Sequence, residues 1–459
     1  MIPARAILGF IDRLERENVS LHGFELREHG DIRAEGYYAP FRKGQPHRMY
    51  SVSKSMVSLA VGLLLEEGRL RLEDPIIGYF PDKLRGEPDG RLARLTLRDM
   101  LRMATCYPKT TYREGVDFCW SDSFFTSRPS HEPGTMFNYD TSCSQVLGEL
   151  CQRVSGRPLL AFLEERVFAP LGATDEKRWL TDPSGIPQGG SGLMMSLGDM
   201  AKVAQCVLDG GRGILPGWYV REATSCQIGT PDRGNPEERF GYGWQFWMTR
   251  SGWAMYGMGG QMAIACPGEG LLLCTIADTR LDPYGVQRLY DAFYDEIVAH
   301  LGEESLPGEE RALGDRLSRL TCAAVPHEPP AGTDALALSA RPPRAYAMEE
   351  NGPGLLSAEV SQTAIRLTWR DGVQTFSWEG FGRIREGVFP GTDVPCLTSA
   401  GMTRDGAVRV RCQLIGDAPC GLEMTIAEKG DTLSLRMQKS SDPLTNRYDG
   451  IVFGRRADP

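Results

Sequence analysis

Ser51 and Lys54 are the two residues of this chain whose types and spacing best suit covalent chemistry. A serine hydroxyl attacks a carbonyl only when a base removes its proton, and a neutral lysine amine can be that base. Residues three apart lie on one face of a helix, so the Lys54 amine can reach the Ser51 hydroxyl. If Ser51 begins the helix, its own backbone N–H can also bind a developing oxyanion. The pair therefore predicts a serine nucleophile with a lysine base.

The segment after Lys54 decides between this hypothesis and a simpler one, in which a serine caps a helix and the lysine is solvated. Residues 56–65 are apolar almost all round, which is typical of a helix buried inside a domain. Burial favours the neutral form of a lysine, and Gly68 stands where a helix commonly ends. The context favours the catalytic interpretation, although an S-x-x-K spacing occurs by chance about once or twice in a chain of this length.

Other catalytic schemes have less support. The sequence holds no G-x-S-x-G segment and no histidine in a context typical of a Ser-His-Asp triad, so we expect His47 to be structural. The six histidines do not cluster and the twelve cysteines form no C-x-x-C pair. Neither a zinc site nor a redox pair is therefore indicated, and no metal or cofactor is predicted. The cysteines lie in apolar segments, where we expect buried free thiols.

Length and composition indicate a globular protein of two domains. The chain has 459 residues, of which 41% are hydrophobic and 24% charged, with a net charge of −9. This charge argues against a nucleic acid or an anionic membrane as a partner. No apolar run approaches the roughly 20 residues of a membrane helix, and the first residues lack the pattern of a signal peptide. We therefore expect a cytoplasmic protein.

The order of the predicted elements suggests where the Ser51 helix lies. A hairpin is predicted over residues 24–38, several helices between 97 and 208, strands at 241–247, 261–266 and 271–277, and a helix at 286–301. This order predicts an α+β domain over residues 1–301, with an antiparallel sheet, flanking helices and an inserted helical lobe. Sites in such folds usually lie between the lobes.

The rest of the chain has a different pattern. Residues 302–344 are rich in proline, glycine and charge, with room for one helix at 309–320, and are interpreted as a linker. From 345 to 459 apolar and polar residues alternate, with turn signals at Asp371-Gly372 and at residues 429–431. This alternation predicts a separate antiparallel β domain, a small barrel or a sandwich.

Residues 47–55 (HRMYSVSKS), followed by EGRL at 67–70 and DP at 74–75, resemble the serine β-lactamase-related family. That family includes class C β-lactamases, family VIII esterases, D-aminopeptidases and 6-aminohexanoate-oligomer hydrolases. Further similar segments lie at 95–101, 133–135, 170–172, 190–193, 199–201 and 241–244. The resemblance covers residues 21–301 and implies a β-lactamase/transpeptidase-like fold.

The resemblance also assigns residues to the site. The family's Y-x-N motif reads Tyr139-Asp140-Thr141 here, so Tyr139 is the expected proton-transfer residue, unless it is a buried core tyrosine. Thr141 stands where relatives carry an asparagine that helps hold the lysine and a substrate amide. The aromatic Trp244 is a candidate wall of the substrate pocket.

The family's third motif, K-T-G or H-x-G on a strand edge, falls in residues 256–261. Met258 replaces the cation. Gly259 and Gly260 leave room for a substrate against the strand because they lack a Cβ. The backbone N–H of Gln261 is the expected second oxyanion donor, alongside that of Ser51. The alternative for this segment is a plain glycine-rich turn between strands.

These assignments imply a hydrolase that forms an acyl-enzyme on a small ester or amide. Met258 argues against a β-lactam as the natural substrate, because it cannot hold the carboxylate of such a drug. The changed second and third motifs leave an alternative, a slow-turnover penicillin-binding-like protein that binds or senses its ligand. A degenerate scaffold is a third reading, against which the intact Ser51, Lys54 and Tyr139 argue. The expected partner is a small molecule, without nucleic acid or membrane, and a homo-oligomer is compatible with the sequence.

Overall fold

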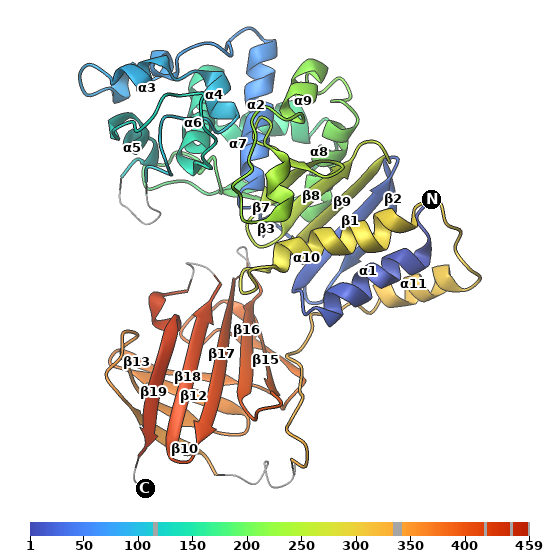
Figure 1. Ribbon diagram of the computed structural model, residues 1–459, viewed down its shortest axis with the longest axis vertical. Coiled ribbons are helices and arrows are strands. Elements are labelled where there is room, and N and C mark those ends of the chain that lie inside the picture. Colours follow the sequence, from blue (N-terminus) through green and yellow to red (C-terminus); the bar gives the residue numbers. More distant parts are fainter. Residues whose placement is uncertain (113–117, 334–341, 417–419, 441–443, 458–459) are drawn as a thin grey trace. The chain divides into compact units, whose positions relative to one another are not determined.

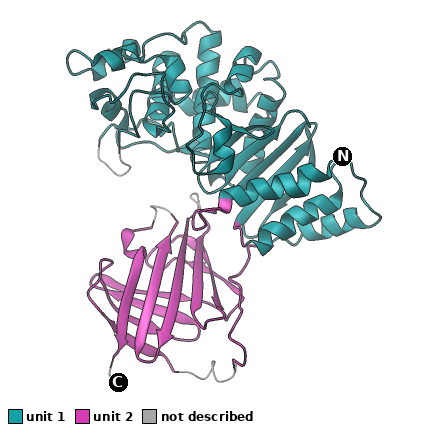
Figure 2. Ribbon diagram, viewed as in Figure 1, with its two compact units in different colours: residues 1–17, 21–277, 286–320 teal, residues 18–20, 278–285, 321–459 magenta. Residues whose placement is uncertain are grey.

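The computed structural model describes residues 1–112, 118–333, 342–416, 420–440 and 444–457. The chain forms two compact units, shown in Figure 2. Unit 1 comprises residues 1–17, 21–277 and 286–320, and unit 2 comprises 18–20, 278–285 and 321–459. None of the described helices is both long and apolar enough to cross a membrane.

Unit 1 is built on a six-stranded antiparallel sheet in the order β2-β1-β9-β8-β7-β6 (Figure 1). Its strands are β1 (Leu21–Glu28), β2 (Asp31–Tyr37), β6 (Trp247–Thr249), β7 (Gly252–Gly257), β8 (Gln261–Cys266) and β9 (Leu271–Ala277). The N-terminal hairpin pairs with β9, so everything between β2 and β6 is inserted into one sheet. This arrangement confirms the predicted fold class.

Helices cover the sheet and form the inserted lobe. The helices α1 (Ala4–Arg16), α10 (Gly285–Ala292) and α11 (Glu309–Leu317) lie beside the sheet in Figure 1, and α11, within the predicted linker, packs on α1. The inserted helices are α2 (Val52–Glu66), α3 (Gly90–Arg94), α4 (Leu97–Leu101), α5 (Trp120–Thr126), α6 (Thr141–Ser155), α7 (Leu159–Leu163), α8 (Leu197–Leu208) and α9 (Gly217–Ala223). A small sheet joins β3 (His47–Arg48), β5 (Leu193–Met195) and β4 (Arg178–Trp179). Short helical turns lie at Ile76–Tyr79, Pro81–Lys83, Glu164–Phe168, Pro236–Phe240, Phe293–Ile297 and Val298–His300.

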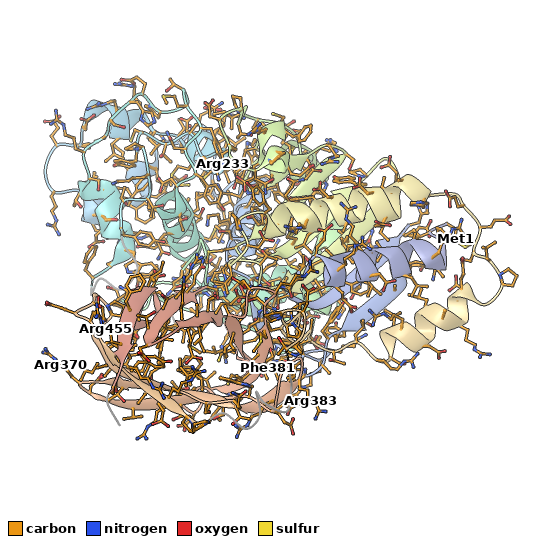
Figure 3. All side chains as sticks on the ribbon, turned by 60° about the horizontal axis from the view of Figure 1, so that its bottom comes forward. Met1, Arg233, Arg370, Phe381, Arg383 and Arg455 are labelled. Atoms are coloured by element: carbon orange, nitrogen blue, oxygen red, sulfur yellow. The ribbon has the colours of Figure 1, made fainter. Side chains whose placement is uncertain are left out.

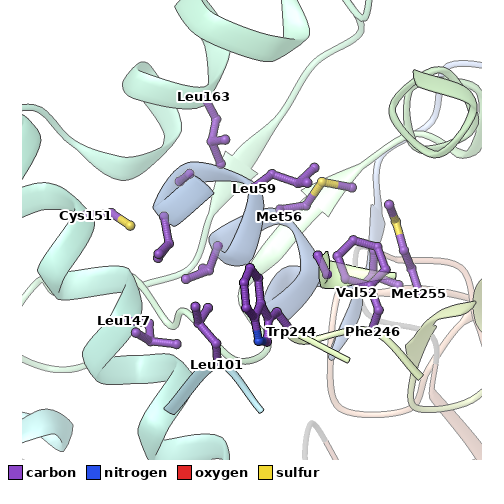
Figure 4. Close-up of a cluster of buried hydrophobic side chains, with 14 of the residues drawn as sticks. Val52, Met56, Leu59, Leu101, Leu147, Cys151, Leu163, Trp244, Phe246 and Met255 are labelled. Atoms are coloured by element: carbon purple, nitrogen blue, oxygen red, sulfur yellow. The ribbon is translucent and has the colours of Figure 1, made fainter. Parts of the chain in front are cut away.

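The helix α2 is the centre of the core of unit 1. Every residue from Val52 to Leu64 is buried, as expected for a helix that is apolar almost all round. Figure 4 shows its side chains packed among residues from the helical lobe and from the sheet, including Leu147, Phe246 and Met255. The sheet and the lobe therefore both depend on α2 for packing, and its first turn is held from both sides.

Unit 2 is a ten-stranded antiparallel sheet that curls into a nearly closed barrel (Figure 1). Its strands are β10 (Arg344–Met348), β11 (Leu355–Val360), β12 (Ala364–Trp369), β13 (Gly372–Ser377), β14 (Ile384–Val388), β15 (Pro395–Met402), β16 (Val408–Leu414), β17 (Cys420–Lys429), β18 (Thr432–Lys439) and β19 (Gly450–Arg456), with a short turn at Asn446–Tyr448. Apolar residues on alternate positions fill its interior. The hairpin predicted at Asp371-Gly372 joins β12 to β13.

The start of α6 fixes the position of Tyr139, which lies two residues before the helix. Asp140 caps the helix: its carboxylate accepts a hydrogen bond from the Ser142 backbone N–H at 2.9 Å and from the Thr105 hydroxyl at 3.2 Å. Asp140 is fully buried, and this burial raises the pKa of its carboxyl to about 6. An ionised Asp140 is therefore less favourable in the folded chain than in the unfolded one.

This raised pKa predicts a pH-dependent difference between Asp140→Asn and the unchanged protein. A carboxyl whose folded pKa lies above the unfolded value stabilises the fold at low pH, and the contribution is lost as pH rises through the folded pKa. Asparagine keeps a capping oxygen but does not titrate. The free energy of unfolding of Asp140→Asn, relative to the unchanged protein, should rise by about 1 kcal/mol from pH 5 to pH 8.

Urea unfolding at the two pH values measures this difference. The control is Asp232→Asn, because Asp232 is exposed to solvent. If the difference in free energy of unfolding between Asp140→Asn and the unchanged protein changes from pH 5 to pH 8 no more than it does for the control, the raised pKa of Asp140 is contradicted.

Candidate active site

The structure places Ser51 directly before the first residue of α2, with Lys54 on the first turn. The Lys54 Nζ lies 2.9 Å from the Ser51 Oγ and donates a hydrogen bond to the Gly190 carbonyl at 2.6 Å. Lys54 is 1% exposed, whereas Ser51 is half-buried. The amine is thus shielded from water while the hydroxyl stays accessible, as a nucleophile and its base require.

Tyr139 lies against the same two groups. The Lys54 Nζ lies 5.1 Å from the centroid of its ring, and the Ser51 side chain interacts with its phenol. Burial raises the pKa of the Tyr139 phenol well above its usual value. Tyr139 is therefore a protonated phenol at neutral pH, which can donate a proton but cannot serve as a phenolate base.

The other side of Lys54 is formed by a turn at residues 188–191 and by the start of α6. A Cβ added to Gly190 would lie 2.4 Å from the Thr141 Cγ2 and 3.2 Å from the Lys54 Nζ. Glycine is thus required here for close approach, and Thr141 turns its methyl group toward the turn. The sequence analysis had placed Gly190 only within a similar segment, and its contact with Lys54 was not predicted.

The glycine-rich segment after β7 approaches Ser51 from the sheet. A Cβ on Gly257 would lie 2.1 Å from the carbonyl oxygen of Met49, two residues before Ser51. Gly259 and Gly260, with φ values of 88° and 94°, then turn the chain into β8. Met258 is 45% exposed on this turn. The predicted substrate-facing residues therefore lie on a turn whose strand contacts the nucleophile's loop.

Gln261, the first residue of β8, braces this turn with its side chain. Its buried amide nitrogen donates to the carbonyls of Met258 at 2.9 Å and Ala277 at 2.8 Å. A neighbouring contact, from the Thr275 hydroxyl to the Gly260 carbonyl at 2.8 Å, adds to the bracing. The roles of the Gln261 and Ser51 backbone N–H groups as oxyanion donors remain predictions.

Trp244 does not lie in the pocket, and this corrects the expectation that it lines the substrate site. It is 1% exposed and packs in the core beside Tyr219, with 5.1 Å between ring centroids. Its carbonyl accepts a hydrogen bond from Ser58, two turns along α2 from Ser51. Trp247 is instead the tryptophan that stacks on Tyr139, at 5.4 Å.

One ion pair next to Tyr139 was not predicted. The Arg233 guanidinium lies 5.9 Å from the Tyr139 ring centroid and 5.4 Å from that of Trp247. Its Nε donates to a Glu238 carboxylate oxygen at 2.7 Å. The pair therefore brings no net charge to this side of the site. Figure 3 labels Arg233, which comes from a loop that carries no recognisable motif.

The described residues include no group of three or more histidine, cysteine or acidic side chains arranged to hold a metal ion. The twelve cysteines form no disulfide, and nine of them are buried.

Comparison with known proteins gives relatives of several activities. A 6-aminohexanoate-dimer hydrolase from Paenarthrobacter ureafaciens is 26% identical over 220 residues, covering 44% of this chain and 55% of that protein. The esterase EstB from Burkholderia gladioli is 28% identical over 176 residues, covering 33% of this chain and 45% of that protein. The chain thus spans about half the length of these curated relatives.

Solved structures share the fold. A putative beta-lactamase from Bacteroides dorei DSM 17855 has a TM-score of 0.55 at 19% identity, over 65% of this chain and 100% of its own. EstCE1, described as a hydrolase with promiscuous acyltransferase activity, has a TM-score of 0.52 at 17% identity, over 63% of this chain and 98% of its own.

The family model described as Beta-lactamase matches residues 23–286. This range is more than half of the chain and includes Ser51, Lys54, Tyr139 and the turn after β7. The chain belongs to the beta-lactamase family.

Proposed function

We propose that the protein is a serine hydrolase that cleaves a small ester or amide through an acyl-enzyme on Ser51. The observation that carries this proposal is the contact of the Lys54 amine with the Ser51 hydroxyl at 2.9 Å, with the Tyr139 ring 5.1 Å from the same amine. Relatives named as an esterase and as a 6-aminohexanoate-dimer hydrolase are compatible with either bond type.

In the first half of the reaction, the Ser51 Oγ attacks the substrate carbonyl while the neutral Lys54 amine takes its proton. The N–H groups of Ser51 and Gln261 hold the resulting oxyanion. As the intermediate collapses, the bond to the leaving group breaks and the Tyr139 phenol supplies the proton that this group needs, recovering one from Lys54. In the second half, a water molecule attacks the acyl-enzyme, releases the acid and returns the proton to Ser51.

Variants of the three residues test this scheme with p-nitrophenyl butyrate as substrate. Ser51→Ala removes the nucleophile and Lys54→Met removes the base, so kcat/KM should fall on the order of 10³-fold or more for each. Tyr139→Phe removes only a proton relay and should cost on the order of 10²-fold.

Lys43→Met is the matched control for the lysine variant, because Lys43 belongs to the same unit and its side chain is 68% exposed. Its kcat/KM should equal that of the unchanged protein. Retention of normal activity by Ser51→Ala would rule out the assigned nucleophile.

Thr141 and Met258 stand where relatives carry an asparagine and a cation. These differences also favour a second candidate function, a slow-turnover binding or sensing protein of the penicillin-binding type. Such a protein would acylate normally but deacylate slowly. Rapid-mixing measurements separate the two functions, because a sensor releases one equivalent of product in a burst and then stops, whereas a hydrolase continues at a steady rate.

The charges around the site predict a preference for uncharged substrates. Met258 offers no charge on the exposed turn, and the charge of Arg233 is compensated by Glu238. A lost charge-assisted contact costs about 1.5–3 kcal/mol, or one to two powers of ten in kcat/KM. The enzyme should therefore cleave p-nitrophenyl butyrate much more efficiently than nitrocefin, whose carboxylate lacks a cationic partner here.

Met258→Lys should shift the ratio of the two kcat/KM values toward nitrocefin by about tenfold or more. Leu306→Lys, which adds the same charge at an exposed leucine of unit 1 outside the site, should leave the ratio unchanged. Equal efficiency of the unchanged protein on both substrates would show that another group holds the carboxylate.

A further inference from the structure

The orientation of the Lys54 amine depends on a backbone carbonyl. A neutral amine has a single lone pair, which must point at the Ser51 Oγ to accept its proton. The Gly190 carbonyl accepts an Nζ–H bond at 2.6 Å, and the Ser51 Oγ lies 2.9 Å from the same nitrogen. The position of the Gly190 carbonyl therefore helps to decide where the lone pair points.

The turn that carries this carbonyl is pressed onto the first turns of α6. A Cβ on Gly189 would lie 2.3 Å from the Ser144 carbonyl oxygen, and one on Gly190 would lie 2.4 Å from the Thr141 Cγ2. These contacts stop the turn from moving toward α6. They do not stop it from moving away, because close packing resists compression but holds two segments together only weakly.

Gln145 supplies the directional contact. It lies one helical turn after Thr141 on α6 and is fully buried. Its Oε1 accepts a hydrogen bond from the Gly189 N–H at 3.1 Å. After Gly190 in the chain, the N–H of Gly192 donates to the Gln188 carbonyl at 2.8 Å. The segment that includes Gly190 is thus tied at both ends, to α6 and to its own turn.

The amide nitrogen of Gln145 is not stabilised by its burial. This atom, Nε2, has no hydrogen-bond partner among the described residues, and an unsatisfied buried donor is unfavourable. An apolar side chain of the same length would avoid this cost but would leave the buried Gly189 N–H without its acceptor. The Oε1 of Gln145 therefore does what an apolar side chain could not: it holds the turn that carries the Gly190 carbonyl.

We propose that Gln145 is a positioning residue for the reaction: it holds Gly189, and through it the Gly190 carbonyl that orients the Lys54 amine toward Ser51. This inference rests on the proposed role of Lys54 as the base. It assigns a functional role to a residue outside the three motifs.

The test measures kcat and KM for p-nitrophenyl butyrate in variants of Gln145. Gln145→Met keeps the length of the side chain but removes the acceptor, so kcat should fall on the order of 10- to 100-fold, because small displacements of a catalytic group cost this much. KM should stay within about twofold, because no substrate contact is changed. Gln145→Glu keeps an oxygen acceptor for Gly189, and its kcat should stay within about threefold of the unchanged protein.

Gln205→Met is the matched control. Gln205 is also buried in unit 1, and its amide nitrogen bonds Asp209 on the end of its own helix α8. Its kcat should stay within about twofold of the unchanged protein. Thermal unfolding midpoints of all variants set an assay temperature at which each is folded. Should the methionine variant not fold, Gln145→Asn replaces it, because its oxygen is one methylene too short to reach Gly189.

Two results would overturn the proposal: normal kcat in Gln145→Met, or a loss in Gln145→Glu as large as in Gln145→Met. A loss that appears in KM alone would also overturn it. These outcomes are distinct from a failure of the proposed function, which would appear as undiminished activity in Ser51→Ala whatever the behaviour of Gln145.

Discussion

Burial of one amine beside an accessible hydroxyl is the constraint on which this active site depends. Lys54 lies on a helix whose next ten residues are buried all round, so water cannot stabilise its charged form. Its amine contacts the Ser51 hydroxyl and the Gly190 carbonyl. An apolar helix of this length needs both the sheet and the lobe to cover it. The chemistry of Ser51 therefore requires the whole of unit 1.

Close backbone approach brings the parts of the site together. Ser51 lies between parts of the chain that are far apart in the sequence. On one side is the turn that follows β7, and on the other are the start of α6 and the turn that contains Gly190. On one side Gly257 touches the carbonyl of Met49, and on the other Gly190 touches Thr141. Side chains at these two glycines would push the segments apart. The antiparallel pairing of β7 with β8 fixes the first contact, and the cap at Asp140 fixes the start of α6 for the second.

Much of the fold could be predicted because its signals are local. The apolar run after Lys54 predicted α2, and the alternation after residue 345 predicted the antiparallel strands of unit 2. The spacing of Ser51 and Lys54 predicted their contact, because a helix places residues three apart on one face. The position of Tyr139 relative to them came only from the resemblance to a known family.

What the sequence did not predict lies in contacts between distant segments. The bond from Gly189 to Gln145 and the stacking of Arg233 on Tyr139 depend on how loops fold over α6. Trp244 and Trp247 lie only three residues apart, but Gln245 between them has a φ of 64°. This left-handed residue redirects the chain, so that one tryptophan enters the core and the other reaches the site. Neither periodicity nor composition records such a change of direction.

The central claim is that Ser51 becomes acylated during turnover. Acid quenching of the protein within the first turnovers of p-nitrophenyl butyrate, followed by peptide mass spectrometry, tests it directly. The account predicts a mass increase of one butyryl group on the peptide that contains Ser51, and none on that peptide in Lys54→Met quenched at the same time. Continued release of nitrophenol with no acyl group on Ser51, or with the acyl group on another residue, would contradict it.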